Sequence, residues 1–292
     1  MQLLVNALIA GSLAALIAGG LALVYGLLGI FNLALGQTVL LGGYATWFLY
    51  QELHLPLTVS ILGGVLVGIL FTALTFEIFV NPFYRLHRFL PLVTTIALSM
   101  IFDGIILLLF QSSPKSIVPG LSPIQKIAGA SISNEQLLLI GATLILLLLC
   151  AYILHATPLG RRIRATVQHE HAAMSLGIPT GFLFRSVFIL SEALAAAGGI
   201  FIGIDQNLSP TLAFPITIKA YAAIIAGGKG NFWGAILCAY LIALLEQLLI
   251  GIHWFGAFYV PAGYQSTVAL LFIIVFLLLK PTGLFVTHSR TA

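Results

Sequence analysis

The sequence predicts an all-α integral membrane protein, built as a bundle of about eight to nine transmembrane helices. Hydrophobic residues make up 60% of the 292 positions and charged residues only 7%, with a mean hydropathy of +1.13. A soluble domain carries about 25% charged residues, so this chain has too few to form a water-solvated surface. Lipid permits only helices and closed barrels, and runs such as 137–149 lack the alternation of barrel strands. Helices are therefore expected.

Apolar runs divide the chain into its expected spans. They lie at about 3–30, 36–51, 57–80, 91–110, 137–156, 182–204, 217–228, 232–251 and 263–280. A perpendicular crossing needs about 20 residues, so the runs 36–51 and 217–228 are short and are either tilted, broken or re-entrant. Glycines at helical spacing, such as Gly64 and Gly68, predict close helix packing. The loops are short, so residues 1–292 are expected to form a single transmembrane domain.

Basic residues in the short loops predict the orientation in the membrane. They are concentrated in the connections 81–90 and 157–181, whereas the loop 111–136 has only two lysines. We therefore expect the first two connections in the cytoplasm and the N-terminus outside. If the run 217–228 crosses the membrane, the C-terminus is cytoplasmic as well. The first apolar run has no preceding basic residue and is expected to be a membrane helix, not a cleaved signal peptide.

No motif for catalysis or metal binding is complete in the sequence. The stretch Gly227–Asn231 is rich in glycine but lacks the spacing of a phosphate-binding loop, and His169 and His171 are two residues apart where helical zinc ligands need four. Cys150 and Cys238 lie in apolar runs and are expected to be small core residues. We expect no enzyme activity, no metal and no cofactor bound by this chain. The net charge of +4 does not indicate nucleic acid, because the basic residues lie in membrane loops.

The cytoplasmic loop 157–181 is the most informative polar segment. Proline and glycine at 158–160 and at 177–179 are expected to end the flanking helices, which predicts one short polar helix over 164–176. A short surface helix with small residues suits docking into a groove on a partner. An ordinary positively charged loop that fixes the topology is the equal alternative.

Several stretches, in order along the chain, resemble the permeases of branched-chain amino-acid ABC transporters, the LivH-type family. They are Leu23–Thr38 continuing to Gly42–Ala45, Tyr84–Ser99, Arg161–Ile178, Lys219–Ala235 with Glu246, and Leu279–Phe285. Together they span nearly the whole chain. Leu35 stands where the family more often has histidine, and Ala97 replaces a usual glycine. Asp103 and Glu192 stand where neutral residues are expected, and these departures leave the substrate open.

The resemblance implies a permease subunit of an ABC importer in a bacterial-type inner membrane. It implies branched-chain or related amino acids as substrate, with urea and short amides in the same family. The implied partners are separate ABC ATPase subunits that bind ATP-Mg, a second permease subunit that is identical or homologous, and an extracytoplasmic solute-binding protein. The residues assigned to ATPase coupling are Arg161, Arg164, Glu170, Ala172, Ala173, Leu176 and Gly177. A sugar or nucleoside permease, an ion-coupled secondary carrier and a membrane scaffold are the alternatives.

Polar residues inside the apolar runs are candidates for a transport pathway. A charge at mid-bilayer costs about 2.5–3.5 kcal/mol, so it is retained when paired, solvated or functional. For Glu77 and Glu246 we prefer a structural carboxyl at a helix contact. The candidates for lining the pathway are Asn32, Gln37, Thr95, Ser99, Asp103 and Glu192. Hydrogen bonds between helices are the structural alternative for these six.

Overall fold

The protein is helical almost throughout, as the sequence predicts. The computed structural model describes residues 1–87, 89–118, 124–127, 129–228 and 230–251, and isolated positions between 267 and 285. In this part of the chain, seven helices are long and apolar enough to cross a membrane. They confirm the all-α membrane class. The predicted run 263–280 lies largely outside the described residues, as do Arg88 and the C-terminal end.

The first part of the chain forms helices α1 to α6 and a short β-hairpin. The helices before the hairpin are α1 (Gln2–Leu28), α2 (Leu35–Trp47) with the π-helical turn η1 (Phe48–Glu52), α3 (Leu57–Thr75) continued by η2 (Phe76–Val80) and α4 (Asn81–Leu86), and α5 (Leu90–Phe110). A two-stranded antiparallel hairpin, β1 (Ile124–Ile127) and β2 (Ala130–Ser133), then leads into α6 (Asn134–Ala156). Ser133 and Gln136 form a capping box that starts α6.

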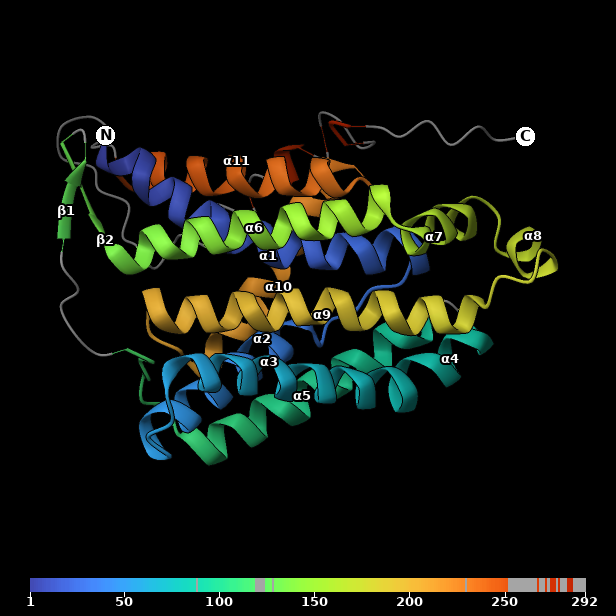
Figure 1. The fold of residues 1–292 in the computed structure, drawn as a ribbon, viewed down its shortest axis with the longest axis horizontal. Helices are drawn as coiled ribbons and strands as arrows, with labels where there is room; N and C mark the ends of the chain where they lie inside the picture. The colour runs from blue at the N-terminus through green and yellow to red at the C-terminus, as the bar shows by residue number, and fades with distance from the viewer. Residues whose placement is uncertain are drawn as a thin grey trace.

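The second half begins with the polar helices α7 (Pro158–Gln168) and α8 (Glu170–Ser175). The remaining elements are α9 (Thr180–Asp205), the 3-10 turn η3 (Pro210–Leu212), α10 (Ala213–Gly227) and α11 (Phe232–Gly251). Figure 1 shows the long helices running roughly alongside one another, with α7 and α8 at one end. The N-terminus and the β1–β2 hairpin lie at the opposite end (Figure 1).

Helices α1 and α9 form the centre of the bundle. Helix α1 packs against α6, α9, α10 and α11, and α9 packs against α2 and α3 as well. Helices α3, α5 and α6 are peripheral, and large apolar side chains such as Leu62, Leu108 and Leu138 point away from the protein. An apolar outer surface of this kind is stable in lipid, where the solvent is as apolar as the side chains.

Glycines bring α2, α3 and α9 into close contact, which confirms their predicted packing role. A Cβ atom on Gly42 would lie 2.7 Å from the carbonyl oxygen of Ala196, and one on Gly199 would collide with the backbone of Val39. A Cβ atom on Gly68 would lie 2.6 Å from the side chain of Ala196. Only hydrogen fits at these crossings, so the three backbones approach more closely than larger residues allow.

The structure corrects the predicted helix over 164–176. Helix α7 already begins at Pro158, because Thr157 caps it with its hydroxyl and proline is favoured in the first turn, where no backbone N–H partner is needed. The chain then breaks at His169, which adopts an extended backbone conformation (φ −155°, ψ 97°) between α7 and α8. Two short helices therefore replace the single predicted one.

The two short apolar runs behave differently. Helix α2 has 13 residues, about 20 Å at 1.5 Å per residue, and the five residues of η1 extend it, but the whole segment is still shorter than the hydrocarbon core of about 30 Å. The run predicted at 217–228 starts earlier, at Pro210, and the segment Pro210–Gly227 is long enough to count among the candidate spans. Pro210 and Pro215 precede the predicted run, and both lie in first turns, where proline leaves no hydrogen bond unmade.

Candidate functional site

The candidate site centres on a break in the helical chain between α1 and α2. Helix α1 ends at Gly29, whose left-handed conformation (φ 63°) lets its N–H bond the carbonyl of Tyr25. The chain is non-helical from there to Leu35, and Asn32 in this stretch is only 1% exposed. Asn32 contacts Glu192, which lies midway along α9. Irregular backbone at such depth is tolerated only where protein or water satisfies its polar groups.

Asn32 and its backbone satisfy much of the hydrogen bonding at this break. Its side-chain Nδ2 donates to Oε1 of Glu192 at 2.6 Å, and its Oδ1 accepts from the N–H of Ala34 at 3.1 Å. Its backbone N–H donates to the hydroxyl of Tyr221 at 2.6 Å, and the same hydroxyl donates to its carbonyl at 3.0 Å. One residue therefore connects the break to α9 and to α10.

The N-terminus of α2 lies beside the buried Glu192. Glu192 is 1% exposed, and Thr38 in the first turns of α2 is the other polar side chain next to its carboxyl group. Ala34 at the start of α2 provides no side-chain cap. A carboxyl group near a helix N-terminus is stabilised by the positive end of the helix dipole. The contacts of Glu192 with Asn32 and Thr38 thus connect α9 to the break and to α2.

Helix α5 contributes a polar stripe, Thr95, Ser99 and Asp103, spaced four residues apart and therefore on one face. The hydroxyl of Thr95 accepts a hydrogen bond from the N–H of Leu33 at 3.2 Å, and Asp103 accepts one from Nε2 of Gln37 at 2.9 Å. Ser99 lies between them, half-buried, and donates to the carbonyl of Ile96 in its own helix at 2.9 Å.

The six predicted pathway residues therefore form a polar line across neighbouring elements, from α9 over the break and the start of α2 to α5. Glu192, Asn32 and Thr95 surround the break, and Gln37 continues to the α5 stripe. Gln37 is 2% exposed, whereas Asp103 is only partly buried. The line thus runs from the centre of the bundle to its edge at α5, a helix that is otherwise largely exposed.

The predicted coupling residues lie at the end of the molecule formed by α7 and α8 (Figure 1). Six of them are exposed or half-buried: Arg161, Arg164, Glu170, Ala172, Leu176 and Gly177. Arg164 donates to the carbonyl of Leu154 in the last turn of α6, and Leu176 is 81% exposed. Ala173 is 3% exposed, so its side chain faces the protein and does not offer a docking surface.

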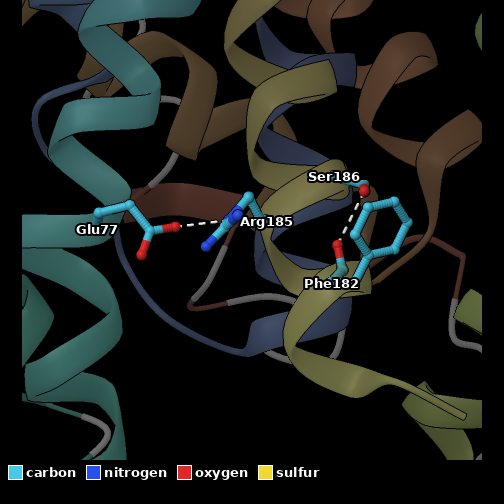
Figure 2. A network of polar contacts seen from close by, with 4 residues as sticks. All are labelled: Glu77, Phe182, Arg185 and Ser186. Carbon is cyan, nitrogen blue, oxygen red and sulfur yellow. Dashed lines mark hydrogen bonds and ion pairs between the residues drawn. The ribbon is translucent and has the colours of Figure 1, made fainter.

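In the part of the chain that the structure describes, two ion pairs connect helices, and the sequence did not indicate their partners. Glu77 of η2 pairs with Arg185 of α9 at 2.6 Å, and Figure 2 shows the two side chains pointing toward each other. Lys219 of α10 pairs with Glu246 of α11 at 2.9 Å. Both Glu77 and Glu246 therefore lie at helix contacts, as predicted.

Tyr221 and Lys219 are the residues that sequence reasoning missed. Both lie in the stretch Lys219–Ala235 that resembles the LivH-type permeases, and this resemblance was the only available signal. A tyrosine in an apolar run usually packs through its ring, so its hydrogen bonds to Asn32 were not predictable from spacing. Within the described residues, no three His, Cys, Asp or Glu side chains are grouped closely enough to hold a metal ion.

Comparison with known proteins identifies the family. The model of the permease component of branched-chain amino acid transport systems matches residues 3–278. This chain belongs to that family. The resemblance inferred from the motifs is thereby confirmed, and the chain is a membrane-spanning permease subunit. The sugar-permease and ion-coupled alternatives are not favoured.

Individual relatives agree over nearly their full length. The chain is 28% identical to the high-affinity branched-chain amino acid transport system permease protein BraD of Pseudomonas aeruginosa, covering 97% of this chain and 95% of the relative. It is 25% identical to the corresponding protein LivH of Escherichia coli K12, covering 97% and 94%. A solved structure of PsaBC from Streptococcus pneumoniae in complex with Fab shares the fold, with a TM-score of 0.50, 17% identity, and coverage of 100% and 94%.

Proposed function

We propose that this chain forms one half of the route for branched-chain or related aliphatic amino acids in an ABC importer, with residues 1–292 acting as a single transmembrane domain. Family membership supports the substrate class. The main observation in support of this route is the hydrogen bond between the buried Gln37 of α2 and the partly exposed Asp103 of α5. Asp103 and Ser99 offer oxygen atoms that accept hydrogen bonds from a substrate ammonium group.

The exposure of Asp103 supports a second permease subunit at the edge of the bundle at α5. A carboxyl group facing lipid near the middle of a span costs about 2.5–3.5 kcal/mol, so such residues face protein or water. Helix α5 is largely exposed in the single chain, and Asp103 is only partly covered. A second subunit, identical or homologous, would enclose a water-lined route against this edge and remove the carboxyl group from lipid.

Helices α7 and α8 would transmit the conformational change of the ATPase subunits to this chain. We assign ATP hydrolysis to separate ATPase subunits that dock on the cytoplasmic loop 157–181. Exposed apolar side chains support docking at this end, since Val167, Met174 and Leu176 are 50%, 44% and 81% exposed. Helix α9 begins at Thr180, after a short connection from α8, and extends past Glu192 at the α1–α2 break, so a displacement of α8 can be transmitted along α9. An extracytoplasmic solute-binding protein would deliver substrate at the opposite end.

Uptake by the complete importer tests this function. The complex is reconstituted in proteoliposomes with its ATPases and solute-binding protein, and leucine uptake is measured with and without ATP. Asp103→Asn keeps the hydrogen bond to Gln37 but removes the charge, and we expect it to reduce uptake about tenfold, equivalent to ~1.4 kcal/mol. Glu135→Gln, which removes a carboxyl at the start of α6, is the matched control and should not reduce uptake. Uptake without ATP that collapses with the proton gradient would contradict the proposal.

A further inference from the structure

A cavity lies apart from the α2–α5 edge, between α1, α9, α10 and α11. Its volume is about 190 Å³, and its walls are mostly aliphatic. The polar groups that line it include Lys219, Glu246 and Gln206. None of the residues lining this cavity belongs to the polar line from Glu192 to Asp103. The cavity is therefore a second place at which a small molecule can contact this chain.

Lys219 and Glu246 form a close ion pair in the wall of this cavity. The Nζ atom of Lys219 lies 2.9 Å from Oε1 and 3.0 Å from Oε2 of Glu246. The side chain of Glu246 is 3% exposed and that of Lys219 is 24% exposed. Two charges with so little water are expensive to bury, and replacing such a pair by apolar residues is often neutral or stabilising. Packing alone therefore gives little reason to place a charged pair beside an otherwise aliphatic cavity.

The charges of this pair restrict what the cavity can accept. The pair is neutral as a whole, so a ligand that is also neutral overall adds no uncompensated charge to a poorly solvated region. A zwitterion meets this condition and offers one group of each sign. A ligand with only an anionic or only a cationic group would leave one charge unbalanced, which is strongly unfavourable where water is excluded.

We infer that this cavity binds a small zwitterion with an aliphatic side chain, its carboxylate accepting hydrogen bonds from Lys219 and its ammonium donating to Glu246. The aliphatic side chain would lie against Ile17, Ile202, Ile216 and Ile242, which line the same cavity. The assignment of the ligand to the transported amino acids rests on the proposed function. The chemistry of the cavity itself requires only opposite charges joined to an apolar group.

The cavity is closer to the end of the bundle that carries the N-terminus. Gln206 lines the cavity and directly follows α9, whose last residue, Asp205, accepts a hydrogen bond from Gln136 at 3.0 Å. Gln136 belongs to the first turn of α6, beside the hairpin, which Figure 1 places opposite α7 and α8. A ligand here would be on the side at which substrate is delivered in the proposed function, and away from the ATPases.

Binding of radiolabelled leucine to the complete importer complex, in nanodiscs and without the solute-binding protein, tests this site. We expect isoleucine and valine to compete with leucine. Isocaproate, which lacks the ammonium, and isoamylamine, which lacks the carboxylate, should compete at least about tenfold more weakly. This comparison uses the unaltered protein, so it does not depend on the folding of any variant. Equal competition by all four compounds would overturn the inference.

Two variants locate the binding. Ala243→Leu fills the cavity and leaves both charged residues in place, and the double variant Lys219→Met with Glu246→Gln removes both charges together. Each should weaken leucine binding at least about tenfold. Gly141→Leu is the matched control, because a Cβ atom at Gly141 meets no atom within 4 Å, and it should bind like the unaltered complex.

The experiments distinguish a wrong assignment of the cavity site from a wrong proposed function. Unchanged leucine binding in Ala243→Leu, together with normal ATP-driven leucine uptake by the unaltered importer, would overturn the cavity site and leave the function standing. Absence of ATP-driven amino-acid uptake by the unaltered importer would overturn the function itself. Zwitterion-selective binding that Ala243→Leu abolishes would in that case still support the cavity, with a ligand of the same chemistry from another source.

Discussion

At the scale of single residues, Asn32 connects three parts of the fold through its hydrogen bonds. It lies in the non-helical stretch between α1 and α2, inside the bundle. Its side chain and backbone together form hydrogen bonds with Glu192, Ala34 and Tyr221. Burying an unpaired polar group costs free energy, so one residue that provides hydrogen bonds to several such groups contributes strongly to the stability of the fold. The gap between the apolar runs 3–30 and 36–51 indicated an interruption here, but the partners of Asn32 come from α9 and α10.

We therefore expect Asn32→Ala to destabilise the protein by about 1.5–3 kcal/mol, the range for hydrogen bonds to charged groups. The substitution leaves the buried carboxyl of Glu192 without its Asn32 donor and the N–H of Ala34 without its acceptor. Thermal unfolding of the purified protein in detergent measures the effect. Because the break also positions the start of α2, leucine uptake should fall together with stability.

The control for this change is Ser186→Ala. The hydroxyl of Ser186 donates to the carbonyl of Phe182 at 2.8 Å, within α9 itself, as Figure 2 shows. Its loss breaks no contact between elements and should leave the unfolding temperature unchanged. If Asn32→Ala unfolds at the same temperature as Ser186→Ala, the hydrogen bonds at the break do not stabilise the fold.

At the scale of elements, apolar runs located the helices but not their neighbours. Helices α1 and α5 are equally hydrophobic, yet α1 is largely buried and α5 largely exposed. Lipid and protein interior are equally apolar, so burial leaves no periodic pattern in the sequence. The break at His169 was unpredictable for a similar reason, because no proline or glycine marks it. Glycines were more informative where helices cross, because the missing side chains of Gly42, Gly68 and Gly199 permit close packing there.

Gly199 gives the sharpest test of this packing. A methyl group there would collide with the backbone of Val39, where α9 crosses α2, and backbone atoms cannot move aside as a flexible side chain can. We expect Gly199→Ala to destabilise the protein by about 1–3 kcal/mol, the usual range for overpacking. Denaturant or thermal unfolding in detergent measures it.

Gly141→Ala makes the same chemical change in α6, where a Cβ atom meets nothing within 4 Å. It should leave stability unchanged or slightly increased, because alanine is the better helix former. Equal stability of the two variants would mean that α2 and α9 can separate without loss, and that the close crossing does not hold them together.

At the scale of the whole molecule, the two ends differ in chemistry. One end carries the basic helix α7 and the short helix α8, and the other carries the N-terminus and the β1–β2 hairpin (Figure 1). Helix α9 joins them and passes the buried Asn32–Glu192 contact on the way. The proposed ATPase contact, the helix break and the end proposed to receive substrate therefore follow one another along α9.

Leu176→Glu tests the ATPase contact. Leu176 is 81% exposed beside α8, so a charge there should not disturb folding but should oppose an apolar contact with a partner. We expect co-purification of the ATPase subunits to fall about tenfold, which corresponds to ~1.4 kcal/mol. Ile124→Glu places the same charge on a 62% exposed residue of the hairpin and should leave co-purification unchanged. Full recovery of the ATPases with Leu176→Glu would remove Leu176 from the docking surface.

Cysteine labelling at the same two positions, 176 and 124, tests the orientation of the protein in the membrane. Single cysteines replace Leu176 or Ile124 in a background in which the buried Cys150 and Cys238 are changed to alanine. Basic residues near α7 favour the cytoplasmic side, so a membrane-impermeant maleimide added to intact cells should label the cysteine at 124 and not the one at 176. Inverted vesicles should give the opposite pattern. If the cysteine at 176 is labelled in intact cells, α7 and α8 face outward, and no cytoplasmic ATPase can drive transport through them.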